Sequence, residues 1–345
     1  MISTKDRILF RADGNHIIGL GHITRCMALA DMLDNNFEIV FLCRKLTNEQ
    51  KIIVSKSFSL IELNGDNLQD EIIELENIIN KDDIVVLDGY CFDLSYQTKV
   101  KTMAKKLVMI DDLAERKIIA DLIINHGGEF IKDKYDLESN SELLAGFKYL
   151  LVRKEFLKSR FEIKEISKID TVFICMGGSD PFNVTPKALQ ATLDCNFVKK
   201  IIVVAGNAFM NFDEIHAIAS LNKHVEIKIE RNVDAKAMVK LINESQIAIC
   251  PSSSIALEVC CVGSGILTGY VIDNQFSIHE QIMNNKCGIS VGDFNTSSIA
   301  DITYLLCKLN DLKVIRMLVA NQKKALGDCN SNFLLHKFKE ISYGA

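Results

Sequence analysis

The chain has 345 residues, of which 48% are hydrophobic and 25% are charged, and its formal net charge is −5. This length fits two domains of ordinary size, and this composition is that of a folded protein rather than a disordered one. The negative net charge argues against a nucleic-acid partner and against a polybasic membrane surface. The N-terminus lacks the apolar segment of a signal peptide, and no apolar run is long enough to span a bilayer. We therefore expect a cytoplasmic protein with neither a nucleic-acid nor a membrane partner.

The 11 cysteines are scattered along the chain, and no Cys-x-x-Cys pair occurs among them. Zinc sites and redox motifs therefore lack their usual spacing. Several of the cysteines lie inside apolar runs, which indicates free, buried thiols in a reducing compartment.

Short β-branched runs alternate with segments of helical period in the first half of the chain. The expected strands are 8–10, 38–43, 84–87, 107–110 and 122–124, with helical patterns between them, for example at 23–33 and 96–106. Strands that are apolar nearly throughout and separated by helices predict a parallel sheet covered on both faces.

A polar stretch at 154–168 interrupts this rhythm, and the pattern then restarts. Further strands are expected at 171–175, 201–204, 225–229, 247–250, 265–270 and 289–291, and 299–343 has a helical pattern. The sequence thus predicts an α/β fold with a Rossmann-like domain at 1–155, a second at 165–315 and a helical tail at 316–345.

The first glycine-rich loop follows the first expected strand and leads into a helix. Arg11 and Asp13 precede it, Gly21 and His22 lie at its exit, and Arg25 is three residues further on. Such a junction is where α/β folds bind phosphorylated ligands. A histidine there could also exchange a proton with water near neutral pH, although a capping or solvated histidine would look the same.

Two segments of the second half repeat this arrangement. Gly177-Gly178-Ser179 follows an apolar strand, and Pro181 suits the first turn of a helix. The Pro-Ser-Ser-Ser segment at 251–254 also leads from a strand into a helix, with Glu258 one turn on. These amides and hydroxyls could bind a phosphate, and Glu258 could bind two ribose hydroxyls. A tight turn, capping serines and a surface carboxylate near the helix dipole are the alternatives.

Other polar residues follow the apolar strands. Asp88-Gly-Tyr90 and Asp111-Asp112 are expected at one edge of the first sheet, where carboxylates could bind a metal, act as acid and base, or simply cap helices. The amides of Asn274 and Gln275, in the second half, could hold sugar hydroxyls or acetamido groups, or could form a turn.

These motifs occur in the order expected of one family. The Gly-His-Ile-x-Arg segment at 21–25 and the Cys-Met-Gly-Gly segment at 175–178 are its most specific parts. The chain resembles the UDP-sugar hydrolases of pseudaminic acid biosynthesis, which are relatives of the peptidoglycan UDP-GlcNAc transferase. The resemblance extends from the first expected strand to the last and leaves the helical tail unmatched. It implies a GT-B-like fold, with two Rossmann-type parallel-sheet domains that face each other across a cleft.

The resemblance also implies a reaction. Water attacks the anomeric carbon of UDP-2,4-diacetamido-2,4,6-trideoxy-β-L-altropyranose with inversion and releases UDP, without a metal or another cofactor, in a protein expected to be a monomer. The implied catalytic residues are His22 and Tyr90: His22 acts on the water, and Tyr90 lines the sugar site with Asn274. Gly177, Gly178, Ser253 and Ser254 surround the diphosphate, and Glu258 holds the ribose. The implied substrate-binding residues are Arg11, Asp13, Gly21, Arg25, Asp88, Gly177, Gly178, Ser179, Ser253, Ser254, Glu258, Asn274 and Gln275.

The chain departs from the family pattern in two ways. The Asp-His-Tyr of the family is Asp88-Gly89-Tyr90 here, and the chain is longer than the minimal hydrolase. Two other functions remain open. A GT-B glycosyltransferase needs the same UDP site but transfers the sugar to an acceptor, and a catalytically silent nucleotide-sugar-binding protein needs no histidine at position 22.

Overall fold

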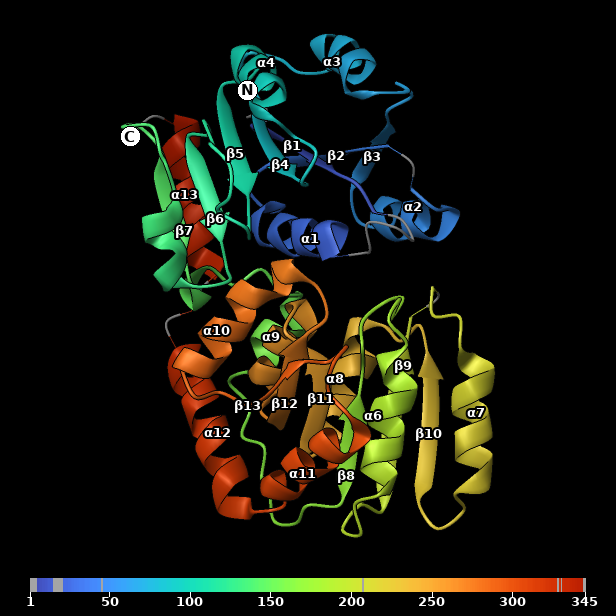
Figure 1. The fold of residues 1–345 in the computed structure, drawn as a ribbon. Coiled ribbons are helices and arrows are strands. Elements are labelled where there is room, and N and C mark those ends of the chain that lie inside the picture. The colour runs from blue at the N-terminus through green and yellow to red at the C-terminus, as the bar shows by residue number, and fades with distance from the viewer. Residues whose placement is uncertain are drawn as a thin grey trace. The chain divides into compact units, whose positions relative to one another are not determined.

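The computed structural model describes residues 5–14, 21–44, 46–206, 208–327, 329 and 331–343. The chain forms two α/β units, shown in Figure 1. Unit 1 comprises residues 1–151 and 329–345, and unit 2 comprises residues 152–328. No helix in the described ranges combines the length and the apolar character that a bilayer crossing requires.

Unit 1 is built on a seven-stranded parallel sheet with the order β3-β2-β1-β4-β5-β6-β7. Its strands are β1 (Arg7–Ala12), β2 (Glu38–Cys43), β3 (Ser59–Glu62), β4 (Ile84–Asp88), β5 (Lys106–Ile110), β6 (Leu122–Asn125) and β7 (Glu142–Ala145). Its helices are α1 (Gly21–Leu33), α2 (Asn48–Ser55), α3 (Leu68–Glu76), α4 (Leu94–Met103) and α13 (Ser331–Tyr343), with short 3-10 turns η1 (Glu129–Lys134) and η2 (Phe147–Tyr149). The strand order reverses between β1 and β4, and ligands of open α/β sheets bind beyond the carboxyl ends of the strands at such a point.

The central strand of unit 1 shows why the apolar runs form a buried sheet. Ile8 and Phe10 pack into the cluster on one face of the sheet, and Leu9 packs into the cluster on the other. Successive side chains of a strand point to opposite faces, so a strand covered on both sides is apolar at successive positions, as Ile8, Leu9 and Phe10 are. Helix α13 contributes Leu334 and Phe338 to the first cluster.

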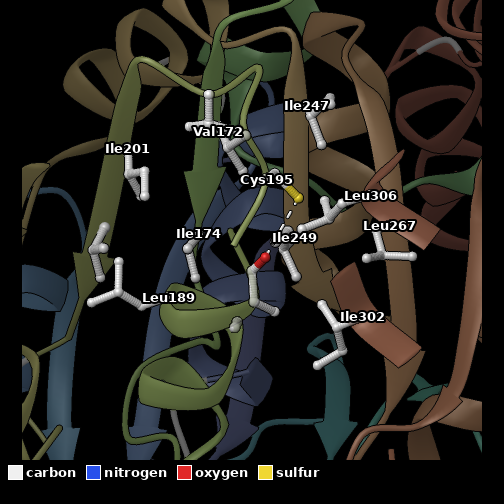
Figure 2. Packing of buried hydrophobic residues seen from close by; sticks show 14 of the residues in the cluster. Val172, Ile174, Leu189, Cys195, Ile201, Ile247, Ile249, Leu267, Ile302 and Leu306 are labelled. Atoms are coloured by element: carbon white, nitrogen blue, oxygen red, sulfur yellow. Dashed lines mark hydrogen bonds between the residues drawn. The ribbon is translucent and has the colours of Figure 1, made fainter. Parts of the chain in front are cut away.

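Unit 2 has a six-stranded parallel sheet with the order β10-β9-β8-β11-β12-β13. Its strands are β8 (Thr171–Ile174), β9 (Lys200–Ala205), β10 (Glu226–Arg231), β11 (Ile247–Pro251), β12 (Gly265–Tyr270) and β13 (Ile289–Asp293). Its helices are α5 (Lys154–Ser159), α6 (Val184–Leu193), α7 (Phe212–Leu221), α8 (Ala235–Glu244), α9 (Ser254–Val262), α10 (Phe276–Asn284), α11 (Ile299–Leu309) and α12 (Leu312–Ala325), with the 3-10 turn η3 (Asp273–Gln275). Figure 2 shows side chains of β8, β9 and β11 packed against residues of α6 and α11.

The expected strands are all present, and two more strands, β3 and β7, complete the first sheet. The expected helical tail at 316–345 is divided between the units. Helix α12 belongs to unit 2, whereas α13 belongs to unit 1, because its apolar face covers part of the first sheet.

The prediction that Pro181 lies in the first turn of a helix is wrong, because α6 begins at Val184. Asp180 and Asn183 both have left-handed backbone conformations, with φ of 43° and 53°, so the chain makes an extra turn before the helix. The Asp180 carboxylate accepts hydrogen bonds from the Val184 and Thr185 amides at 2.9 and 2.7 Å and closes that turn.

Candidate functional site

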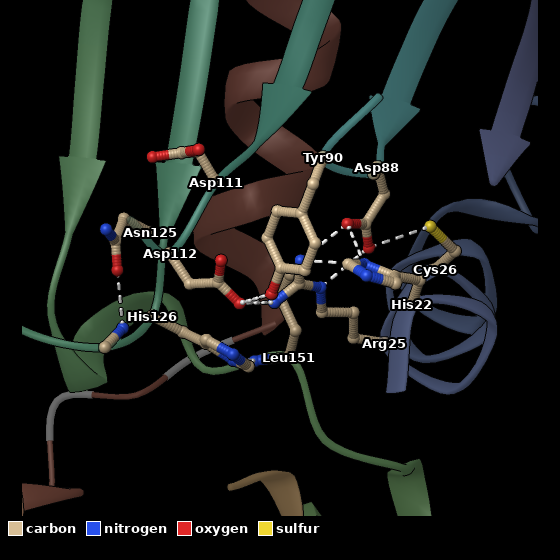
Figure 3. A network of polar contacts seen from close by, with 12 residues as sticks. His22, Arg25, Cys26, Asp88, Tyr90, Asp111, Asp112, Asn125, His126 and Leu151 are labelled. Carbon is tan, nitrogen blue, oxygen red and sulfur yellow. Dashed lines mark hydrogen bonds and ion pairs between the residues drawn. The ribbon is translucent and has the colours of Figure 1, made fainter. Parts of the chain in front are cut away.

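Unit 1 gathers a cluster of polar side chains at the carboxyl edge of its sheet (Figure 3). Asp88 is the last residue of β4, and Asp112 follows β5 by two residues. His22 and Arg25 lie in the first turns of α1, which begins directly beside this edge at Gly21. The residues of 15–20, in the glycine-rich loop before α1, lie outside the described part of the chain.

Asp88 is the centre of this cluster and is fully buried. Its Oδ1 lies 2.7 Å from His22 Nδ1, and its two oxygens accept hydrogen bonds from Arg25 Nη2 and Nε at 2.5 and 2.6 Å. Burial alone would raise the pKa of the carboxyl, but the positive charge of Arg25 and the hydrogen bonds from Arg25 and His22 hold that pKa well below its usual range. Asp88 is therefore ionised.

The ionised Asp88 determines how the His22 ring is used. A carboxylate can only accept a hydrogen bond, so in the 2.7 Å contact the neutral imidazole donates from Nδ1–H and leaves Nε2 unprotonated. Arg25 Nη2, which lies 3.1 Å from the same Nδ1, donates to Asp88 Oδ1 at 2.5 Å. This is the orientation in which a carboxylate holds a histidine that acts as a general base. The side chain of His22 is 7% exposed, and the ring of Tyr90 stands edge-on to it, with the centroids 4.9 Å apart.

Arg25 joins the two carboxylates of the cluster. Its Nη1 donates to Asp112 Oδ2 at 2.8 Å, and the hydroxyl of the half-exposed Tyr90 donates to the same oxygen at 3.1 Å. The guanidinium thus lies between Asp88 and Asp112, in the place that a divalent cation bridging them would need. No group of three or more metal-ligating side chains is found in the described ranges.

Arg11 and Asp13 were expected to bind the substrate, but in the structure they form ion pairs and hydrogen bonds within the protein. The Arg11 side chain is 0% exposed, and it donates to both carboxylate oxygens of Glu71 at 2.6 and 2.8 Å and to Asp13 at 2.8 Å. The hydroxyl of Tyr96 also donates to Glu71, and Asp13 accepts from the amide of Arg44 at 2.7 Å. These pairs tie β1 to α3 and α4, and an enclosed Arg11 cannot touch a ligand in this conformation.

His126 is a member of the cluster that sequence reasoning missed. It follows β6 directly, is 1% exposed, and accepts a hydrogen bond at Nδ1 from the amide of Leu151 at 3.3 Å. Burial, reinforced by the charge of Arg25, lowers the pKa of its imidazole to about 4. The signal was present, because a polar residue directly after a buried parallel strand lies at the same edge as Asp88 and Asp112.

In unit 2, Gly177, Gly178 and Ser179 form the turn after β8. Gly177 has a φ of +89°, which only glycine adopts without strain. A Cβ on Gly206, at the end of β9, would lie 2.3 Å from the carbonyl oxygen of Gly178, so the two loops can approach only because Gly206 has no side chain. At Gly177 and Gly178 the turn therefore presents backbone rather than side chains.

The serine segment of unit 2 begins helix α9. Ser253 is the N-cap residue but makes no capping bond with its side chain, and Ser254 is the first helical residue. Glu258 is 3% exposed, so it is not a surface carboxylate. It accepts hydrogen bonds from Arg153 Nε and Nη2, each at 2.7 Å. Burial raises the pKa of the Glu258 carboxyl, and the Arg153 guanidinium opposes that shift.

Asn274 and Gln275 lie in the short turn η3, before α10. The side-chain oxygen of Gln275 accepts a hydrogen bond from the amide of Val271 at 2.9 Å, so part of this side chain already serves to close the turn.

The chain is similar to several known proteins. No protein-family model matches the chain. Over 79% of its length it is 27% identical to a UDP-2,4-diacetamido-2,4,6-trideoxy-beta-L-altropyranose hydrolase of Campylobacter jejuni, of which 94% is covered. The chain resembles this hydrolase. It is also 22% identical to the spore coat polysaccharide biosynthesis protein SpsG of Bacillus subtilis, over 81% of this chain and 82% of SpsG. An uncharacterized protein of Methanocaldococcus jannaschii is 27% identical, over 96% of this chain and 74% of that protein.

Solved structures establish the fold. MurG of Acinetobacter baumannii matches with a TM-score of 0.66 and 11% identity, covering 98% of this chain and 99% of MurG. The spinosyn rhamnosyltransferase SpnG, complexed with thymidine diphosphate, matches with a TM-score of 0.66 and 10% identity over 96% of this chain and all of SpnG. Both are GT-B glycosyltransferases, so the expected GT-B-like fold with two Rossmann-type parallel-sheet domains is confirmed.

Proposed function

We propose that the protein hydrolyses UDP-2,4-diacetamido-2,4,6-trideoxy-β-L-altropyranose to UDP and the free sugar, with inversion, in the biosynthesis of a nonulosonic acid such as pseudaminic acid. The observation that carries this proposal is the buried pair of Asp88 and His22, with Nδ1 and Oδ1 2.7 Å apart. The similarity to the Campylobacter jejuni hydrolase supports the choice of substrate.

His22 acts as the general base in the proposed mechanism. Its Nε2 accepts a proton from water while the water oxygen forms a bond to the anomeric carbon. The bond from that carbon to the phosphate oxygen breaks, and UDP leaves with the electron pair. Asp88 stabilises the imidazolium that forms, and the ion pair with Arg25 keeps Asp88 ionised. Tyr90, edge-on to the His22 ring, is assigned to the sugar beside it.

Unit 2 is assigned to the UDP part of the substrate. The backbone of Gly177–Ser179 and the start of α9 at Ser253 and Ser254 supply amide and hydroxyl donors for the diphosphate. Donors that stabilise the charge on the leaving diphosphate lower the barrier to its departure. Glu258 is assigned to the ribose hydroxyls, because each carboxylate oxygen keeps a second lone pair when Arg153 is bound to it.

The reaction can be tested directly. The protein is incubated with the UDP-diacetamido sugar without any acceptor, and NMR follows the products. Free sugar released in the inverted anomeric form supports the hydrolase. Turnover only after an acceptor is added would contradict it and identify a GT-B glycosyltransferase, whereas UDP binding without any turnover would identify a nucleotide-sugar-binding protein.

The role of His22 has its own test. Replacement of His22 by alanine or phenylalanine removes the base, so hydrolysis should fall by about 10²- to 10⁴-fold. The affinity for UDP should stay within a few-fold, because His22 and the proposed UDP site belong to different units. His336→Ala is the matched control, since that histidine is exposed on α13. Turnover close to wild type in His22→Ala would remove His22 from the mechanism.

A further inference from the structure

A second buried histidine lies behind the serine segment of unit 2. His279, on α10, is 5% exposed, and its Nδ1 lies 3.0 Å from the hydroxyl oxygen of Ser252. On the other side of the ring, Nε2 lies 3.0 Å from the hydroxyl oxygen of Ser290, on β13. The imidazole therefore connects α10 and β13 to the residue that precedes the start of α9.

The hydrogen atoms of this chain of contacts have only one consistent arrangement. The Thr268 hydroxyl donates to the carbonyl oxygen of Cys250 at 2.8 Å, so its oxygen can only accept from Ser252, which is 2.9 Å away. Ser252 then has no hydrogen left for His279, so the ring must donate to it from Nδ1–H.

The remaining contacts complete the same arrangement. With the proton on Nδ1, Nε2 of the neutral ring is an acceptor and takes the hydroxyl hydrogen of Ser290. The oxygen of Ser290 in turn accepts from the amide of Gly292 at 2.9 Å. Burial lowers the pKa of His279, which agrees with a neutral ring near pH 7.

We propose that His279 is a positioning residue for the diphosphate-binding turn Ser252–Ser254, and that it acts through its Nδ1–H bond to Ser252. The inference rests on the proposed function, which assigns that turn to UDP.

The rest of the turn shows why this bond matters. The Ser252 side chain is 0% exposed, and the backbone amide of Ser252 donates to Gly269 at 2.7 Å. Ser253 makes no capping bond with its side chain, whereas the Ser252 hydroxyl is held on two sides, by Thr268 and by His279. The Tyr270 ring stands edge-on to His279, with the centroids 5.4 Å apart, and holds the imidazole in the plane that this bond requires.

Two amide variants test the inference. Asn in place of His279 puts an N–H donor near the Nδ1 position, whereas Gln puts it near Nε2. We expect His279→Gln to weaken UDP binding by about five- to tenfold, the effect of one lost hydrogen bond, and His279→Asn to stay within about twofold of wild type. Ser290→Ala is the matched control, since it removes the Nε2 partner and leaves Ser252 bound. Affinity is measured by calorimetry with UDP, and folding by thermal unfolding.

The kinetic result should follow the binding result. The KM for the UDP-sugar should rise in His279→Gln while kcat stays near that of wild type, because the proposed base, His22, is unchanged. Equal UDP affinity in the Asn and Gln variants, loss of affinity in Ser290→Ala as large as in His279→Gln, or an effect confined to kcat would each overturn the inference. Failure of the wild-type protein to bind UDP would overturn the proposed function as well.

Discussion

The buried His126 should make the stability of unit 1 depend on pH within a defined window. Its imidazole has a pKa of about 4 in the folded protein, against 6.5 for an ordinary histidine. Between pH 6.5 and pH 4, His126 therefore binds a proton in the unfolded chain but not in the folded one. The neutral His126 therefore makes its full contribution to the free energy of unfolding above pH 6.5, and this contribution is lost as the pH falls toward 4. At about 1.4 kcal/mol per pH unit, a difference of roughly 2.5 units amounts to about 3 kcal/mol.

The assay compares wild type with His126→Asn at several pH values between 7.5 and 4. Asn can still accept from the Leu151 amide but does not titrate, so the difference between the two proteins isolates His126 from carboxylates such as Asp88 that titrate in both. Because the chain has two units, hydrogen exchange of the β5 and β6 amides in denaturant reports the stability of unit 1. Wild type should lose about 3 kcal/mol more than the variant. Parallel pH curves would refute the reasoning.

Three further results are expected. Asp88→Asn keeps the shape of the side chain but removes its charge, so kcat should fall by about 10²-fold or more. UDP affinity, measured by calorimetry, should be unchanged. Near-normal turnover would exclude the Asp88–His22 pair from the chemistry. Glu258→Ala should weaken UDP binding by about 1–3 kcal/mol. Because the variant also removes the partner of Arg153, thermal unfolding is measured to check that the protein still folds. Unaltered affinity would contradict the ribose assignment. Excess chelator should not slow hydrolysis, since Arg25 already lies between Asp88 and Asp112 and pairs with both. Activity lost to chelator and restored by a divalent cation would show that a metal is needed.

The sequence predicted most of the fold because the central strands are covered on both faces. Runs such as 39–43 and 201–204 are apolar throughout, and this pattern is visible without any partner. The two strands that were missed are short, and they begin with exposed residues, Ser59 and Glu142. Strands of that kind depend on pairing with a neighbour more than on their own residues.

The candidate site was predictable only in part. Polar residues after buried strands identified Asp88 and Asp112, because the sheet alone brings them to one edge. The partners of Arg11 and Glu258 were not predictable, because Glu71 and Arg153 come from segments 60 and 105 residues away in the sequence. Nothing local to α3 or to the start of α5 marks a residue that will be drawn into a buried ion pair.

Helix α13 has a consequence for the synthesis of this protein. Leu334 and Phe338 complete a core whose other members lie within the first 151 residues, and the whole of unit 2 is translated in between. Unit 2 can close its own core as soon as it leaves the ribosome. Unit 1 instead keeps part of its apolar surface uncovered until α13 has been synthesised, and exposed apolar surface of this kind promotes aggregation.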